Sequence, residues 1–298
     1  MDISDASVIR TIDKDQLLHL QSWQGRTQTV DDHISAFPVN ALAATLDRDA
    51  STASTQGSLP PLWHWLYFLA CQSQREIGPD GHPKRGGFLP PVPLPRRMWA
   101  GSNLHWLAHN PLQVGDAVQR VSRIESVTHK AGRSGDLLFV RVNHEISNTL
   151  GLALTEQQDL VYRAAAQTGD PVVAPIAAER NARWRREVTP DPVLLFRYSA
   201  LTFNGHRIHY DRRYVTEVEG YAGLVVHGPL LATMLLDLLR SELPAAKVTR
   251  FQFKAVRPTL DLHPFHLNAQ PSADGKSVRL WAEDHEGWLT MQASAEID

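Results

Sequence analysis

The chain has 298 residues, 43% hydrophobic and 21% charged, a composition typical of a globular protein with enough apolar material for a sizeable core. Its 30 basic and 32 acidic residues give a formal net charge of −2, which argues against a protein that holds nucleic acid on a basic surface. There is no amino-terminal signal pattern, no apolar run near the roughly 18 residues of a membrane helix, and one cysteine, Cys71. We therefore expect a cytoplasmic protein without a disulfide, a cysteine-based zinc site or a membrane partner, in which Cys71 is a buried packing residue.

The amino-terminal half begins with two predicted helices. One is expected around residues 14–23, and another over residues 39–46, because Pro38 suits the start of a helix. Residues 49–58 are small and polar and predict a loop. The aromatic and apolar run LWHWLYFLA at residues 62–70 is interpreted as a strand.

A long segment rich in glycine, proline and charge follows at residues 72–95. Loops of this length inside a compact domain are often functional. Alternating apolar and polar residues then predict strands over residues 117–127, 137–146 and 152–162, with a glycine-containing turn at 130–135.

The second half repeats the order of an apolar helix followed by strands. We place an interdomain linker at residues 165–192, where prolines are frequent and apolar clusters are few. Strands are predicted at residues 247–256, 263–269, 277–282 and 288–295. An Asp-Gly hairpin turn is expected at 274–275, between the second and third of them. The repeated order predicts an α+β fold, in which each of two degenerate units is a curved antiparallel sheet round a buried helix.

The most informative stretch is FRYSALTFNGHRIHYDRRYVTEVEGYAGLVVHGPLLATMLLDLL at residues 196–239. Three polar groups cluster in its first part: Asn204, His206 and His209. A nearly all-apolar run begins at Gly228-Pro229 and predicts a helix that is buried on all sides. The N-terminus of such a helix carries unpaired N–H groups and a partial positive charge, so it can hold a developing oxyanion. The stretch therefore predicts an acid–base site facing a carbonyl-polarising site.

The segment TFNGHRIHYD at residues 202–211 resembles the Ser-Gly-Asp-x-Asn-Pro-Ile-His-x-Asp motif of MaoC-like hot-dog hydratases. Together with RRMWAG at residues 96–101 and KAGRSG at residues 130–135, it is similar to a double hot-dog subgroup, the FAS1-like dehydratases. The resemblance covers about residues 15–298. It implies a double hot-dog fold with a degenerate amino-terminal unit at 1–164 and a catalytic unit at 193–298, a homodimer, and no metal or redox cofactor.

Hydration of a conjugated thioester needs a base for water, an acid for the α-carbon and a donor for the enolate-like oxygen. His209 is the expected base, and backbone N–H groups at Gly228 are the expected oxyanion donors. Asn204 occupies the position where the family has aspartate, and His206 the position of asparagine. An amide is neither acid nor base, so Asn204 is expected to orient the reacting groups.

Two explanations for the missing aspartate stay open. His209 works as a lone base, or a carboxylate arrives from elsewhere, from one of Asp211, Glu219, Glu156 and Asp159. The alternative to a catalytic role is that His209 is a buried, hydrogen-bonded position of an alternating strand. A metal bound by His206 and His209 is rejected, because the segment is not strongly helical and offers no third ligand.

Several cations are expected to contact an acyl-CoA substrate. Arginine suits phosphate because its guanidinium donates paired hydrogen bonds. Arg207, beside the histidines, is the expected partner of a free acyl carboxylate. The residues expected at the coenzyme A moiety are Arg96, Arg97, Arg133 and Trp99, and for any single arginine a solvated surface position is the alternative.

The resemblance implies an enoyl-CoA hydratase that converts mesaconyl-C4-CoA or itaconyl-CoA to citramalyl-CoA. A 3-hydroxyacyl-thioester dehydratase of fatty-acid synthesis is the enzyme alternative, and a thioesterase also suits the fold. A non-catalytic acyl-CoA-binding subunit is the third hypothesis, favoured by Asn204 in the aspartate position.

Overall fold

One antiparallel sheet of ten strands dominates the computed structural model, which describes residues 10–48, 57–132, 135–165 and 174–298. The strand order is β1-β3-β4-β5-β2-β7-β10-β9-β8-β6. The first half supplies β1 (Thr27–His33), β2 (Arg96–Trp106), β3 (Ala117–Gly132), β4 (Gly135–Asn148) and β5 (Gly151–Arg163). The second half supplies β6 (Trp184–Val188), β7 (Val248–Ala255), β8 (Phe265–Pro271), β9 (Ser277–Glu283) and β10 (Leu289–Ile297).

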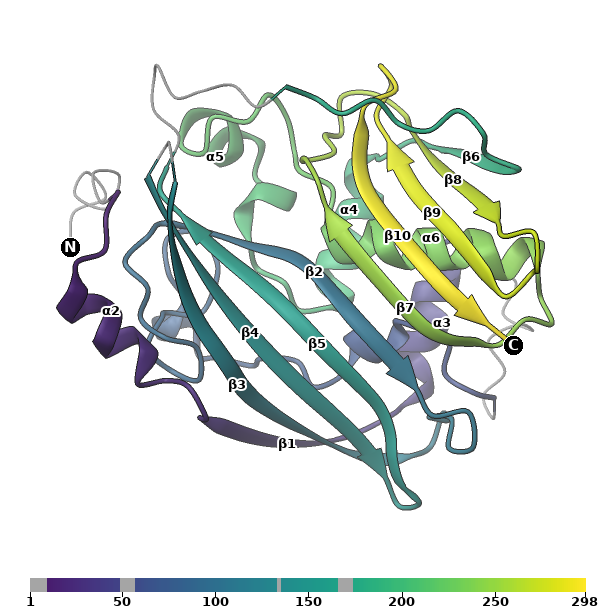
Figure 1. Ribbon diagram of the computed structural model, residues 1–298, viewed down its shortest axis with the longest axis horizontal. Helices are drawn as coiled ribbons and strands as arrows, with labels where there is room; N and C mark the ends of the chain where they lie inside the picture. Colours follow the sequence, from purple (N-terminus) through teal and green to yellow (C-terminus); the bar gives the residue numbers. More distant parts are fainter. Residues whose placement is uncertain (1–9, 49–56, 133–134, 166–173) are drawn as a thin grey trace.

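The two halves of the sheet repeat the same strand order. From the central pair β2–β7 outward, each half runs through its second, fifth, fourth, third and first strand. The two expected sheets are thus joined edge to edge into one continuous sheet (Figure 1). The repeat that the sequence suggested only through the order of its elements is visible here in the topology.

Five described helices accompany the sheet: α2 (Lys14–Gln21), α3 (Ala36–Thr45), α4 (Pro192–Leu201), α5 (Arg212–Glu217) and α6 (Gly228–Glu242). Helix α6 packs against β6, β8, β9 and β10 and lies behind these strands in Figure 1. Every side chain from Leu230 to Leu239 is buried, which confirms the prediction of a helix enclosed on all sides. No helix among the described residues is long and apolar enough to cross a membrane.

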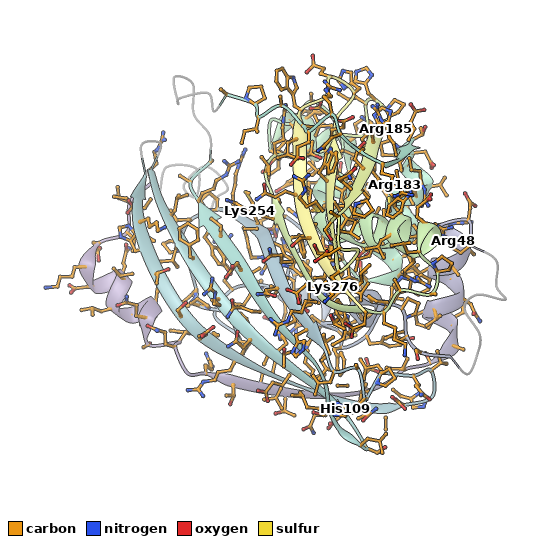
Figure 2. All side chains as sticks on the ribbon, turned by 45° about the vertical axis from the view of Figure 1, so that its right-hand side comes forward. Arg48, His109, Arg183, Arg185, Lys254 and Lys276 are labelled. Carbon is orange, nitrogen blue, oxygen red and sulfur yellow. The ribbon has the colours of Figure 1, made fainter. Side chains whose placement is uncertain are left out.

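A buried carboxylate ties α6 to its surroundings. Asp237 of α6 is ion-paired with Arg48, which follows α3, and with Arg186 of β6 at 2.9 Å. Figure 2 shows Arg48 at the side of the molecule where α6 and α3 lie. Two cations on one buried carboxylate offset the cost of taking its charge out of water.

Two apolar clusters make up the core. The larger one surrounds α6 and includes residues of α3, α4 and the central strands. The smaller one lies between α2, the end of the 72–95 loop and strands β3 to β5, with Val92 and Leu94 from the loop buried in it. The long loop is therefore anchored at its carboxyl end against the first half of the sheet.

Three expectations for the first half are wrong. Residues 62–70 form no strand but contain a 3₁₀ turn, η1 (Trp63–Leu66), because Leu62 and Phe68 have positive φ values of 71° and 56°. Helix α3 starts at Ala36, so Pro38 lies inside its first turn. Cys71 is exposed. Residues 49–56, in the predicted loop, lie outside the described residues.

Five helices and strands were missed by the sequence reasoning: β1, β2, β6, α4 and α5. Strand β2 is the most consequential, because it joins the two halves and carries the RRMWAG segment. Strand β6, which pairs with β8, lies within the linker proposed at 165–192. The domain boundaries remain a proposal, and this strand favours a second unit that begins before residue 193.

Candidate active site

His209 ends a 3₁₀ turn, η3 (Arg207–His209), and is buried beside the segment that leads into α6. The N–H of Val225 donates to the carbonyl oxygen of Ile208 at 3.0 Å, which holds the two segments together. His209 Nδ1 lies 2.6 Å from the carbonyl oxygen of Val225. Since a carbonyl only accepts, Nδ1 carries the proton and Nε2 keeps a free lone pair.

The protonation state of His209 suits a base. Burial lowers the pKa of His209 to about 4, and the hydrogen bond to Val225 offsets this only in part. The imidazole is therefore neutral at pH 7 and can accept a proton from water.

The N-terminus of α6 lies next to His209. The ring of His209 stacks on that of His227, the residue that precedes α6, with 3.7 Å between ring centroids. His227 Nε2 lies 2.8 Å from Ser199 Oγ of α4, which fixes the second ring. Gly228, the first residue of the helix, is half-buried, and a Cβ added there would meet only the end of Met291, at 4.0 Å.

His206 and Asn204 form the turn before His209. The backbone N–H of His206 donates to Asn204 Oδ1 at 3.0 Å, so the side chain of Asn204 stabilises the conformation of the turn. The ring of His206 lies perpendicular to that of His209, with centroids 5.4 Å apart. The three residues named from the motif are thus brought together, with Asn204 supporting the position of His206.

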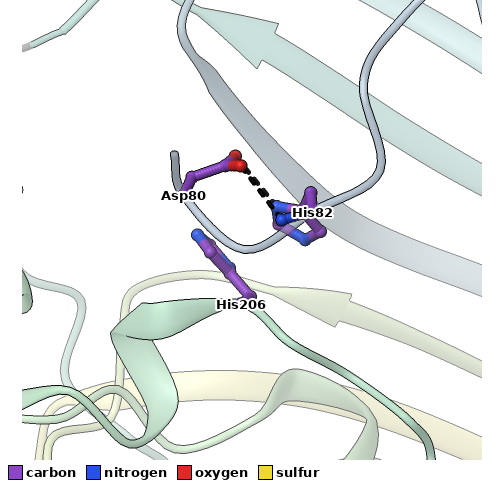
Figure 3. Close-up of side chains that lie close together, drawn as sticks. All are labelled: Asp80, His82 and His206. Carbon is purple, nitrogen blue, oxygen red and sulfur yellow. Dashed lines mark hydrogen bonds and ion pairs between the residues drawn. The ribbon is translucent and has the colours of Figure 1, made fainter. Parts of the chain in front are cut away.

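The long loop of the first half brings two further groups to this site, Asp80 and His82, neither of which was predicted. The rings of His82 and His206 lie 4.0 Å apart, and Asp80 Oδ2 lies 3.0 Å from His82 Nδ1 (Figure 3). Arg207 fixes the loop, because its backbone N–H donates to the carbonyl oxygen of Asp80 at 2.9 Å and its side chain donates to that of Pro79 at 3.0 Å. The length of the loop at residues 72–95 was the reason to expect a function there. The sequence gave no signal for Asp80 or His82 in particular.

The charges of this cluster are set by burial and by contact. Burial opposes ionisation of Asp80, but the hydrogen bonds from His82 outweigh it and hold the pKa of the carboxyl below its usual range. Burial lowers the pKa of both His82 and His206, and the nearby charge of Arg97 acts in the same direction on both. The cluster therefore holds one carboxylate and two neutral imidazoles at pH 7.

Asp80, His82 and His206 also match a metal-ligand set, since their ligand atoms lie within 4.8 Å of one another. The two rings overlap at an interplanar angle of 38°, and His82 Nδ1 is directed at Asp80. His82 Nδ1 and Asp80 Oδ2 are hydrogen-bonded to each other at 3.0 Å, so an ion held by these two atoms would have to displace that bond. The geometry favours a hydrogen-bonded cluster.

None of the four carboxylates proposed from the sequence is bound to the histidines of this site. Glu156 accepts from Ser102 and Trp65 and contacts His64, Asp159 pairs with Arg141, Asp211 pairs with Arg207, and Glu219 pairs with Arg96. Asp80 is the carboxylate that the structure places in the histidine cluster.

The residues expected to contact substrate have different positions. Arg207 pairs with Asp211 and stacks on Tyr214, and Arg96 bonds to Glu219. Trp99 packs among Trp65 and Phe253 and donates its N–H to Gly101 and Ser102. Arg97 lines a pocket of about 40 Å³ beside His206. Arg133 lies outside the described residues.

The buried histidines predict loss of stability in mild acid. The pKa of His209 and of His227 is lowered in the fold, chiefly by burial, whereas an unfolded histidine takes up its proton near pH 6.5. As the pH falls from 6.5 towards 4, the unfolded chain thus binds more protons than the folded one, and each of these two residues should remove up to about 1.4 kcal/mol of stability per pH unit. Urea unfolding at pH 7.5 and pH 5.5 checks this. A stability that is equal at the two pH values would contradict it.

A continuous sheet of two repeated halves, with a neutral histidine beside the N-terminus of a buried helix, is the arrangement of a hot-dog hydro-lyase. Residues 62–261 match the family described as hydroxyacyl-thioester dehydratase type 2, and the chain belongs to this family. It is 44% identical to mesaconyl-C(4)-CoA hydratase of Chloroflexus aurantiacus over 279 residues, 93% of this chain and 97% of that protein.

Solved structures agree on the fold. A MaoC-like dehydratase from Phytophthora capsici has a TM-score of 0.67 at 13% identity, covering 96% of this chain and 99% of its own. A Mycobacterium tuberculosis protein with a double hot-dog fold has a TM-score of 0.54 at 15% identity, covering 92% and 96%. The predicted α+β double hot-dog fold and the expected family are confirmed.

Proposed function

We propose that this enzyme is an enoyl-CoA hydratase that adds water to a short, branched, unsaturated dicarboxyl-CoA. Mesaconyl-C4-CoA is the preferred substrate in this proposal, itaconyl-CoA the second choice, and citramalyl-CoA the product. The single observation that supports it best is the neutral His209 with its free Nε2 beside the N-terminus of α6. The similarity to a mesaconyl-C(4)-CoA hydratase supports the acyl group.

The proposed roles follow the developing charges. His209 Nε2 takes a proton from water, and the oxygen of that water bonds to the β-carbon of the substrate. In mesaconyl-C4-CoA the electron pair of the double bond moves towards the thioester, whose oxygen is stabilised by the N–H of Gly228 and the helix terminus. The proton taken up by His209 Nε2 is then delivered to the α-carbon, so that the elements of one water molecule are added in all.

The residues around His209 support the addition of water, and in this proposal Asn204 neither donates nor accepts a proton. Asn204 holds the turn that carries His206, and His206 lies between His209 and the Asp80–His82 pair. Asp80 would stabilise a proton that reaches His82, since a carboxylate favours the imidazolium form of its partner. We propose Asp80 as the carboxylate that replaces the missing aspartate of the motif.

Dehydration of a 3-hydroxyacyl thioester in fatty-acid synthesis is the second candidate, favoured by the description of the family. It is the reverse of the same reaction and uses the same groups. The pocket beside His206 is small and lined by charged residues, which supports a short polar acyl group over a long chain.

The test is to follow the absorbance of the enoyl thioester with mesaconyl-C4-CoA, itaconyl-CoA and crotonyl-CoA. We expect loss of absorbance, a product heavier by one water and no release of free thiol, with mesaconyl-C4-CoA turned over fastest. Thiol release would identify a thioesterase. No turnover of the three substrates or of 3-hydroxyacyl thioesters, with acyl-CoA still bound, would favour the non-catalytic subunit.

Assembly and location are also proposals. We propose a homodimer, as the resemblance implied, and a cytoplasmic location, as expected from the sequence. The exposed side chains of Phe37 on α3 and Phe196 on α4, 76% and 63% accessible, offer apolar surface for such an assembly.

A further inference from the structure

Arg97 of β2 is a half-buried cation that makes no ion pair or hydrogen bond with its side chain in the described part of the chain. The arginines around it are engaged. Arg85 donates to the carbonyl oxygens of Val92, Leu94 and Pro95, Arg96 bonds to Glu219, and Arg207 pairs with Asp211. A partly desolvated guanidinium without a partner is costly, so this one is suited to an anion that comes from outside the chain.

The pocket that Arg97 lines reaches His206, whose ring centroid lies 5.4 Å from that of the proposed base His209. Its wall also contains Asp80, His206 and Ile208, the last of which precedes the proposed base. The two carboxylates of the wall are already used, because Asp80 is bonded to His82 and Glu219 to Arg96 and Tyr214. Arg97 is therefore the charged group of the wall that is left for a ligand, among the residues that the structure describes.

The chemistry of the proposed substrates requires a cation close to the base. In mesaconyl-C4-CoA and itaconyl-CoA the free carboxylate is attached to the β-carbon, the atom that receives the hydroxyl group. Its receptor must consequently lie within a few bond lengths of the water that His209 activates. Coenzyme A phosphates lie far from this carbon at the other end of the pantetheine arm.

We propose that Arg97 binds the free carboxylate of a dicarboxyl-CoA and thereby selects substrates with a carboxylate on the β-carbon. This inference rests on the proposed hydratase function. It transfers the role expected for Arg207 to Arg97, and it removes Arg97 from the group expected at the coenzyme A phosphates. The planar guanidinium donates two parallel hydrogen bonds to a carboxylate, which fixes the orientation of the β-carbon as well as its charge.

The test compares Arg97→Met and Arg97→Lys with the wild type on mesaconyl-C4-CoA and on crotonyl-CoA, which lacks the carboxylate. Loss of hydrogen bonds to a charged group should lower kcat/KM for mesaconyl-C4-CoA roughly 10- to 100-fold in Arg97→Met. The lysine variant should lose less, because it keeps the charge. Turnover of crotonyl-CoA and inhibition by free coenzyme A should stay within about twofold. Arg123→Met, at an exposed position of β3, is the matched control.

The outcomes separate this inference from the proposed function. If the wild type hydrates crotonyl-CoA and the Arg97 variants lose both substrates equally, Arg97 does not recognise the carboxylate, although the hydratase proposal stands. Weaker inhibition by coenzyme A in Arg97→Met would return Arg97 to the phosphates and overturn the inference. If the wild type hydrates none of the thioesters, the proposed function itself fails.

Discussion

Replacement of His209 by asparagine should lower kcat/KM for hydration of the enoyl thioester by about 10²- to 10⁴-fold, the usual contribution of general acid–base catalysis. The asparagine amide can still donate to the carbonyl oxygen of Val225, as His209 Nδ1 does. The basic Nε2 is lost, however, and an amide does not take up a proton from water. Initial rates with mesaconyl-C4-CoA, together with urea unfolding, separate the lost base from a damaged fold.

His109→Asn is the matched control for this variant. His109 is exposed and lies near the bottom of the molecule in Figure 2, in the turn that follows β2. The control should keep full activity. A His209→Asn enzyme with activity within a few-fold of the wild type would show that the base is another group, and His206 or His82 would then be the next residue to replace.

The pH dependence gives an independent check on the same residue. Because the pKa of His209 is lowered to about 4, the proposed base keeps its neutral form throughout the neutral and mildly acidic range. In short assays that precede unfolding, the rate should therefore not fall with a pKa near the usual 6.5 of histidine. A fall centred near pH 6.5 would assign the base to a group whose pKa is not lowered.

The sequence predicted those parts of the site that depend on neighbouring residues. Asn204, His206 and His209 are close in sequence and lie in one turn of the structure. The apolar run after Gly228 is long enough to predict a buried helix from its composition alone. These local patterns survive folding because the chain has little freedom over a few residues.

The parts that depend on contacts between distant residues could not be predicted. Asp80 reaches His206 across more than a hundred residues of sequence, and no periodicity or spacing encodes that meeting. The sequence favoured Arg207 over Arg97 as the partner of the acyl carboxylate, because it does not tell which arginine finds an internal partner; in the structure Arg207 pairs with Asp211. Strand β2 was missed because its first residues, Arg96 and Arg97, are charged, although they lie in the middle of the sheet order.

The contact between the two halves of the site predicts a second large effect, at Gly81. Its φ is +89°, and a side-chain carbon at this position would lie 1.8 Å from the carbonyl oxygen of Gly205. Backbone atoms cannot give way like the end of a flexible side chain, so Gly81→Ala must separate the loop from the histidine turn. We expect a loss of about 2–5 kcal/mol of stability, the sum of the cost of the left-handed conformation and of overpacking.

Activity should fall with stability, because the shifted loop carries Asp80 and His82 away from His206. Gly86→Ala is the matched control, since Gly86 lies in the same loop with φ +96° but would meet only Pro91, at 3.6 Å. This control should lose about 1–2 kcal/mol from the backbone conformation alone and keep its hydratase activity. Unfolding in urea gives the stability and initial rates give kcat/KM, both measured for the two variants at pH 7.5.

Equal losses of stability in the two variants would mean that the close approach of Gly81 to Gly205 does not contribute to the destabilisation. A Gly81→Ala enzyme that is destabilised yet fully active would exclude Asp80 and His82 from the reaction, while His209 could remain its base.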